Sequence, residues 1–229
     1  MTVEAQAAVA AAPPITTQAE AARYALLRRL APSMRHHLVV NLQPIGMIYE
    51  VMDRRLKAGE PQLAEVHESA QKINGFARAA LDSCLDVVTW LAPEEQRLTL
   101  ASEGISECLG LLTTSLTFRG FSVRNEAPAL QGQVRRAAIR TVLTAALLHV
   151  TDQGAAPADV VVAAQTDGDI LVLTVTLRPT DGEGSFGGEA AYRQLAWEDV
   201  QALAEAEAVK AEREGKLQVR LAIPLGAVT

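Results

Sequence analysis

The chain has 229 residues, of which 49% are hydrophobic and 21% charged, an ordinary composition for a globular protein of one large domain or two small ones. Its net charge of −6 and aromatic content of 4% argue against nucleic-acid binding, which relies on basic surfaces and stacking platforms. No apolar run approaches the roughly 20 residues of a membrane-spanning helix, so we expect no membrane partner and a cytoplasmic location.

The first 16 residues are rich in alanine and end shortly after Pro13 and Pro14. Glu4 comes early, and the stretch contains no Lys or Arg, so it lacks the basic start of a signal peptide. We expect residues 1–16 to be a disordered leader.

Residues 17–92 carry the apolar spacing of two long helices. Thr17 and Glu20 have the spacing of a capping box, which marks a helix start. Apolar residues then recur every three or four positions until Gly59 and Pro61, after which the same period resumes. The simplest arrangement is an antiparallel helical hairpin. One hairpin cannot cover the apolar stripes of both its helices, so we expect a homodimer in which two hairpins form a four-helix bundle.

After Pro93 the pattern changes to short alternating segments separated by helices. In chain order we expect a strand over 97–101, a helix, a strand over 121–125, a helix over 133–150, a strand hairpin around Asp167 and Gly168, a helix over 197–213 and a strand over 216–225. This order predicts a mixed sheet covered on one face by helices, an α/β sandwich over residues 97–229.

This succession of elements, with histidines in the first helix, resembles the core of a sensor histidine kinase. In that family the phosphorylated histidine is followed by leucines two and six positions later and an aliphatic residue nine positions later. Counted from His36, this sequence has Leu38, Leu42 and Ile45 at those positions. The resemblance implies an α+β fold, with a dimerisation and histidine-phosphotransfer hairpin over 17–92 followed by a degenerate GHKL-type ATPase-like domain over 97–229.

The polar positions of the family pattern differ here. His37 stands where the family has an acid that activates the nucleophile, and Val40 where it has Thr or Asn. The nucleotide-binding motifs are missing as well. Alignment on the family's N-box places Ala145 and His149 where asparagines belong, and the strand that ends near Pro179 lacks the expected Asp. The resemblance therefore implies no nucleotide site on this chain.

A helical wheel separates the two histidines. At about 100° per residue, the apolar residues between Leu27 and Leu56 fall opposite His36, which therefore points to solvent, whereas His37 lies on the flank. A solvent-exposed imidazole is partly unprotonated at pH 7 and offers a ring nitrogen as a nucleophile. We predict that His36 is the phosphoacceptor, that His37 packs beside it or orients it, and that Arg35 offers charge to phosphoryl oxygens. An incidental surface histidine and a solvated arginine are the alternatives.

Val39, Val40, Gln43 and Met47 form a surface next to His36 that is largely apolar where a solvated helix is usually polar. Leftover apolar surface is one explanation. We interpret these residues as a docking patch for a partner protein, which the resemblance implies to be the receiver domain of a response regulator.

These observations predict a dimeric histidine phosphotransferase of a two-component phosphorelay, in which His36 passes a phosphoryl group between receiver aspartates. The receiver brings its own Mg²⁺, so we expect no metal or other cofactor on this chain. The alternative is a catalytically inactive pseudo-histidine-kinase that acts as a dimeric interaction module, which the altered polar positions favour. A working ATP-dependent kinase requires nucleotide motifs that the sequence lacks.

Overall fold

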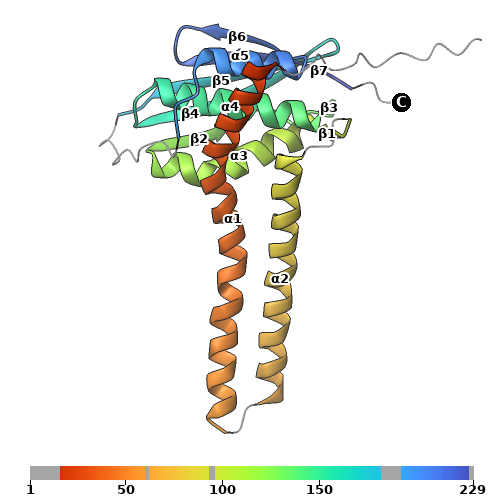
Figure 1. The fold of residues 1–229 in the computed structure, drawn as a ribbon, viewed down its shortest axis with the longest axis vertical. Helices are drawn as coiled ribbons and strands as arrows, with labels where there is room; N and C mark the ends of the chain where they lie inside the picture. The colour runs from red at the N-terminus through yellow and green to blue at the C-terminus, as the bar shows by residue number, and fades with distance from the viewer. Residues whose placement is uncertain (1–15, 60–61, 93–95, 182–191, 227–229) are drawn as a thin grey trace, which may run out of the picture.

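The structure, a computed structural model, describes residues 16–59, 62–92, 96–181 and 192–226. The predicted leader lies outside the described residues except for Thr16. Figure 1 shows two long antiparallel helices that form a stalk, with an α/β domain at one end of it. The predicted α+β class is confirmed, and so is the order of a helical hairpin followed by a sandwich. The four-helix bundle needs a second chain and stays a prediction.

In chain order the elements are α1 (Thr17–Lys57), α2 (Leu63–Leu91), β1 (Leu98–Leu100), α3 (Ala101–Phe118), β2 (Phe121–Asn125), β3 (Gln133–Arg135), α4 (Arg136–Gln153), β4 (Ala158–Asp167), β5 (Ile170–Pro179), α5 (Trp197–Ala206), β6 (Lys210–Glu214) and β7 (Gln218–Pro224).

Five strands form one mixed sheet in the order β2-β4-β5-β7-β6, in which only the β2–β4 pair is parallel. Helices α3, α4 and α5 pack on this sheet, and α4 lies at the centre of the core, where every residue from Val142 to Thr151 is buried. β1 and β3 form a separate antiparallel pair beside α3 and α4. The α/β domain is therefore a layer of helices on a sheet.

Two segments that the sequence analysis assigned to helices are strands. Residues 133–135 pair with β1, and residues 210–213, the end of the helix expected over 197–213, belong to a strand that pairs with β7 at the edge of the sheet. The second segment is rich in Ala, Glu, Lys and Arg, which favour helices in isolation. Pairing with β7 outweighs this local preference, and charged side chains suit an edge strand because they discourage pairing with another chain.

α1 is one continuous helix although Pro32 and Pro44 lie inside it. A proline has no N–H, so the carbonyls of Arg28 and Val40 lose their usual helical partners. The remaining helical hydrogen bonds keep the helix continuous, and tertiary packing supports it around Pro32. Its first half packs against α3, α4 and α5, an arrangement that the predicted domain division at residue 92 did not include.

The second half of α1 is packed differently. The last buried residue of the helix is Met34, and every residue from 35 to 57 is exposed or half-buried in the single chain. This half runs beside α2 as the stalk in Figure 1. The junction between the two halves lies next to the histidine pair.

Candidate functional site

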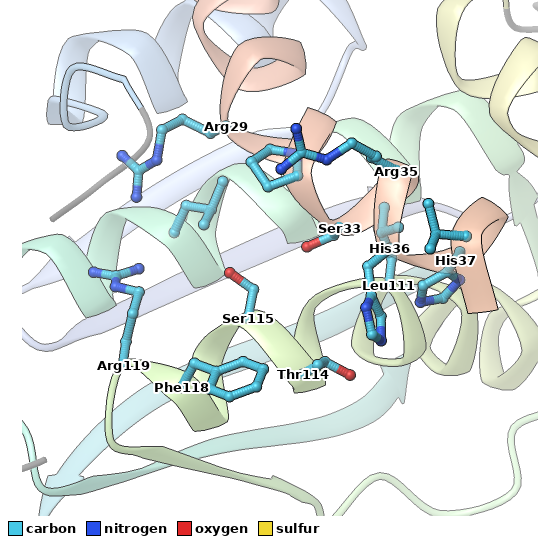
Figure 2. A pocket seen from close by; sticks show the side chains of 13 residues that line it. Arg29, Ser33, Arg35, His36, His37, Leu111, Thr114, Ser115, Phe118 and Arg119 are labelled. Atoms are coloured by element: carbon cyan, nitrogen blue, oxygen red, sulfur yellow. The ribbon is translucent and has the colours of Figure 1, made fainter. Parts of the chain in front are cut away.

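A pocket of about 460 Å³ lies between α1 and α3, and His36 forms part of its wall (Figure 2). From α1 the predicted site residues Arg35, His37 and Val39 line the same pocket. The remaining lining residues are Arg29, Pro32 and Ser33 of α1, Leu111, Thr114, Ser115 and Phe118 of α3, and Arg119 and Leu148. The structure therefore brings the predicted phosphoacceptor next to a cavity of the α/β domain.

The two histidines occupy different environments. His36 is exposed, and Figure 2 shows its ring directed across the pocket toward Thr114 of α3. His37 is half-buried and also lines a second cavity of about 250 Å³ between α1 and α2, together with Asp82 and Ser83. The helical wheel placed His37 on the flank, in agreement with this position. It directed His36 to open solvent, whereas the exposed ring faces the α/β domain.

The residues of the predicted docking patch do not all reach the pocket. Val39 lines it, whereas Val40, Gln43 and Met47 are exposed farther along α1. Val40 is 50% and Met47 61% exposed, which is high for apolar side chains. Phe118, which lines the pocket on the α3 side, is 75% exposed. The apolar surface beside His36 therefore spans both the hairpin and the α/β domain.

A buried ion-pair network fastens α1 to the α/β domain at the pocket. Asp152 receives two hydrogen bonds from Arg29, at 2.6 and 2.7 Å, and one from Arg119 at 2.9 Å. It also accepts the backbone N–H of Leu195 at 3.1 Å. Burial lowers the pKa of Arg119, an effect that Asp152 opposes, and the guanidinium stays charged at neutral pH. Asp152 thus neutralises part of a strongly basic wall.

A second network fastens α2 to α3 and α4. Arg140 donates to Asp86 of α2 at 2.7 Å and to Glu107 of α3 at 2.8 Å, and its guanidinium lies 4.6 Å from the ring centroid of Trp90. Burial raises the pKa of Glu107, but hydrogen bonds from Arg136 and Arg140 outweigh it and hold this pKa below its ordinary value. Both helices of the hairpin are therefore joined to the α/β domain by charged side chains.

Arg29 and Ser33 line the pocket but are not among the predicted site residues. They precede His36 by seven and three positions, a spacing that places all three on one side of a helix. Their spacing from His36 could therefore have identified them from the sequence. The residues of α3 carried no comparable signal, because nothing in their own spacing indicates that they face α1.

The two positions aligned with the N-box asparagines are inaccessible to solvent. Ala145 and His149 are fully buried on α4, and His149 Nδ1 donates to the carbonyl of Leu195 at 2.8 Å. The ring of His149 also lies 5.7 Å from that of Trp197. Within the described ranges, no three His, Cys, Asp or Glu side chains are grouped so as to hold a metal ion, and no helix is long and apolar enough to cross a membrane.

Solved structures of histidine kinases align with this chain at low similarity. The Acinetobacter baumannii histidine kinase AdeS aligns with 81% of this chain and 98% of its own, at 10% identity and a TM-score of 0.41. A histidine kinase from Burkholderia phymatum aligns with 93% of this chain and 100% of its own, at 16% identity and a TM-score of 0.46.

The catalytic domain of the histidine kinase ThkA aligns with 56% of this chain and 94% of its own, at 15% identity and a TM-score of 0.44. No family model matches the sequence, and no curated protein matches it significantly. Alignments at this similarity assign no activity to this chain. The function therefore has to be argued from the residues around His36.

Proposed function

We propose that this protein is a dimeric histidine phosphotransferase that exchanges a phosphoryl group between the receiver domains of response regulators through His36. One observation carries the proposal: an exposed imidazole stands beside Arg35 on a continuous helix, flanked by exposed apolar side chains of α1 and α3. An incoming receiver needs an accessible nucleophile and an apolar surface on which to dock, and both occur here together.

The chemistry requires little from this chain beyond position. An unprotonated ring nitrogen of His36 attacks the phosphorus of a receiver's aspartyl phosphate, the N–P bond forms, and the P–O bond to the carboxylate breaks with its electron pair left on oxygen. The reverse step passes the group to a second receiver. Arg35 offers positive charge to the phosphoryl oxygens. Mg²⁺ would come with the receiver's own acidic cluster, so the chain itself needs no cofactor.

Transfer from a receiver also suits the closed α4 surface. A kinase must hold a nucleotide and its magnesium within reach of the histidine, but Ala145 and His149 are buried where the family's N-box asparagines align. The networks around Asp152 and Arg140 hold the hairpin base against the α/β domain. In this arrangement the α/β domain lies across the pocket from His36 and supplies docking surface.

The stalk supports a homodimer. In the single chain the large apolar side chains along one side of the hairpin are between 44% and 83% exposed: Leu42, Tyr49 and Leu56 of α1 with Leu63, Leu81, Leu85 and Val88 of α2. Apolar surface of this extent is a common mark of a protein–protein interface. A second hairpin related by two-fold symmetry would bury it as a four-helix bundle.

The proposal is tested by incubating the protein with a phosphorylated receiver domain and measuring acid-labile phosphate on the protein. The wild-type chain should acquire it, and His36→Gln should not, with circular dichroism and dimer size unchanged. His37→Gln should retain at least partial transfer and serves as the adjacent control. Phosphate on both variants would contradict the phosphotransferase proposal, and reversed roles would move the acceptor by one residue.

The second candidate is a pseudo-histidine-kinase that binds partners without chemistry. It is favoured by His37 and Val40 in place of the polar residues of the family pattern. In that case receivers bind but leave no phosphate on the wild-type chain. The hypothesis of an ATP-dependent kinase is tested by calorimetry with ATP and Mg²⁺. We expect no binding at physiological nucleotide concentration, and a micromolar dissociation constant would support the kinase hypothesis.

A further inference from the structure

We propose that the pocket between α1 and α3 binds a small organic anion, a phosphate ester or carboxylate with an apolar body, and that the bound anion blocks access to His36. The proposal that the pocket binds an anion depends only on the residues of the pocket. The blocking part rests on the proposed function and deepens it, since it adds a means of regulation at the same site.

The charge of the pocket favours an anion. Its described lining includes the guanidinium groups of Arg29, Arg35 and Arg119 and no carboxylate. Asp152 lies behind the wall and pairs with Arg29 and Arg119, which offsets one of these charges. Arg35 has no ion pair in the parts of the chain that the structure describes. The pocket therefore carries a local excess of positive charge, although the whole chain has a net charge of −6.

Ser33 supplies an unused hydrogen-bonding group. The residue is only 5% exposed, and its Oγ has no partner among the described residues. Other serines within helices, Ser69, Ser83 and Ser106, donate their hydroxyl to the carbonyl four residues earlier. Ser33 does not, and Figure 2 shows its hydroxyl pointing into the pocket. A ligand oxygen at this position would satisfy a buried polar group that otherwise stays unpaired.

The size and the apolar wall favour an organic ligand over a bare inorganic ion. The volume of about 460 Å³ lies within the range of small-molecule sites, which runs from about 300 to 1,000 Å³. Leu111, Leu148 and Phe118 provide apolar surface that a phosphate ion alone would leave uncovered. The anionic group would lie near Ser33 and the arginines, with the apolar body against α3.

The position of the pocket connects the ligand to His36. The imidazole is part of the wall, and Figure 2 shows it facing α3 across the cavity. A ligand in the cavity therefore occupies space beside the ring nitrogen that a phosphoryl group must enter. It also neutralises the charge of Arg35, which the proposed transfer uses.

Binding is tested by calorimetric titration of the full chain with phenyl phosphate, inorganic phosphate and benzyl alcohol. Phenyl phosphate combines the anion and the apolar body, so it should bind at least about tenfold more tightly than either of the others. Ser33→Ala should weaken it about 3- to 10-fold through loss of one hydrogen bond, and Arg35→Gln at least about 10-fold through loss of a charged donor. Arg54→Gln, an exposed arginine near the end of α1, is the matched control and should bind normally.

Equal binding of phenyl phosphate and benzyl alcohol would overturn the anion site, and so would unchanged affinity in both pocket variants. The blocking part is tested separately by adding saturating phenyl phosphate to transfer from a phosphorylated receiver. At least a fivefold slower transfer is expected, and an unchanged rate would overturn the block. Binding without any transfer would reject the phosphotransferase proposal and leave the site standing, whereas transfer without binding would reject the site alone.

Discussion

The two halves of α1 share one helical period but differ in burial. Residues 17–34 place the small side chains Ala19, Ala22 and Ala25 against the α/β domain, where they are almost fully buried. Residues 35–57 carry larger apolar side chains that stay partly exposed in the single chain. Leu26, Leu30 and Met34 are also buried in the first half, so the α/β domain covers this half within one chain, whereas the proposed dimer would cover the second half.

The ion pairs of the two halves also differ in burial: they are more buried in the first half and more exposed in the second. Arg29 and Asp152 are 3% and 0% exposed at their side chains, whereas Arg55 and Glu65 at the tip of the stalk are 56% and 48% exposed. The buried pair joins distant parts of the sequence and fixes the position of the pocket. The exposed pair joins the end of α1 to the start of α2. The first half of α1 (the upper half, residues 17–34) is thus a part of the α/β domain, and the second half (the lower half, residues 35–57) would be the assembly surface of the proposed dimer.

The largest expected effect is on assembly. Leu42→Glu combined with Leu81→Glu should convert the protein to a monomer at tens of micromolar, because both side chains lie on the exposed apolar side of the hairpin and a dimer would bury the new charges. Light scattering measures the change. Met47→Glu is the control, equally exposed but on the His36 side, and it should leave the dimer intact. A wild-type monomer would contradict the assignment of the lower half to assembly.

Asp152→Ala should cost about 3–5 kcal/mol in the free energy of unfolding, because it leaves the buried Arg29 without its partner. Urea denaturation measures this difference. Glu65→Ala removes an exposed pair of the stalk and should cost less than about 1 kcal/mol. Similar costs for the two variants would show that the upper half of α1 is no more firmly attached than the stalk.

The network at the base of α2 should make stability depend on pH. The pKa of Glu107 is lowered in the folded chain by hydrogen bonds from two arginines that outweigh its burial. Its contribution is therefore complete above the ordinary value of 4.5 and is lost as the pH falls through the lower folded pKa. Glu107→Gln should cost about 1–2 kcal/mol at pH 7, and the difference should shrink as the pH falls below 4.5. A difference that does not change with pH would indicate packing rather than charge.

The smallest effect concerns the start of α1. The sequence pattern placed the cap at Thr17, but Thr16 is the N-cap, and its Oγ1 accepts from the N–H of Ala19 at 3.1 Å. Thr16→Ala should cost about 1 kcal/mol in the free energy of unfolding. Thr17→Ala should cost less than half of that, since its side chain caps nothing. Thermal unfolding of the two variants distinguishes these positions, and a larger effect at Thr17 would restore the sequence-based cap.

Much of the fold could be predicted from the periodicity of apolar residues. The elements that were predicted wrongly share one cause. The helices of the hairpin, α3 and the β4–β5 hairpin carry their own patterns, in apolar spacing or in the turn at Gly168, and were predicted. β3 and β6 were missed because short segments with good helix formers become strands only when a partner strand is adjacent. Their state is decided by pairing across the domain, which local sequence does not contain.

The candidate site divides in the same way. The choice of His36 over His37 came from the helical wheel and the spacing of Leu38, Leu42 and Ile45, all within one helix. The sequence by itself thus determined the hairpin and the placement of His36 on the side of α1 away from the apolar stripe, because helical geometry fixes which side chains share a face. Only the tertiary structure decided that α3 lies opposite His36, that Asp152 holds Arg29 and Arg119 together, and that Ser33 keeps a buried hydroxyl unpaired. Those contacts join residues far apart in the chain, and no period within a single element specifies which distant elements will meet.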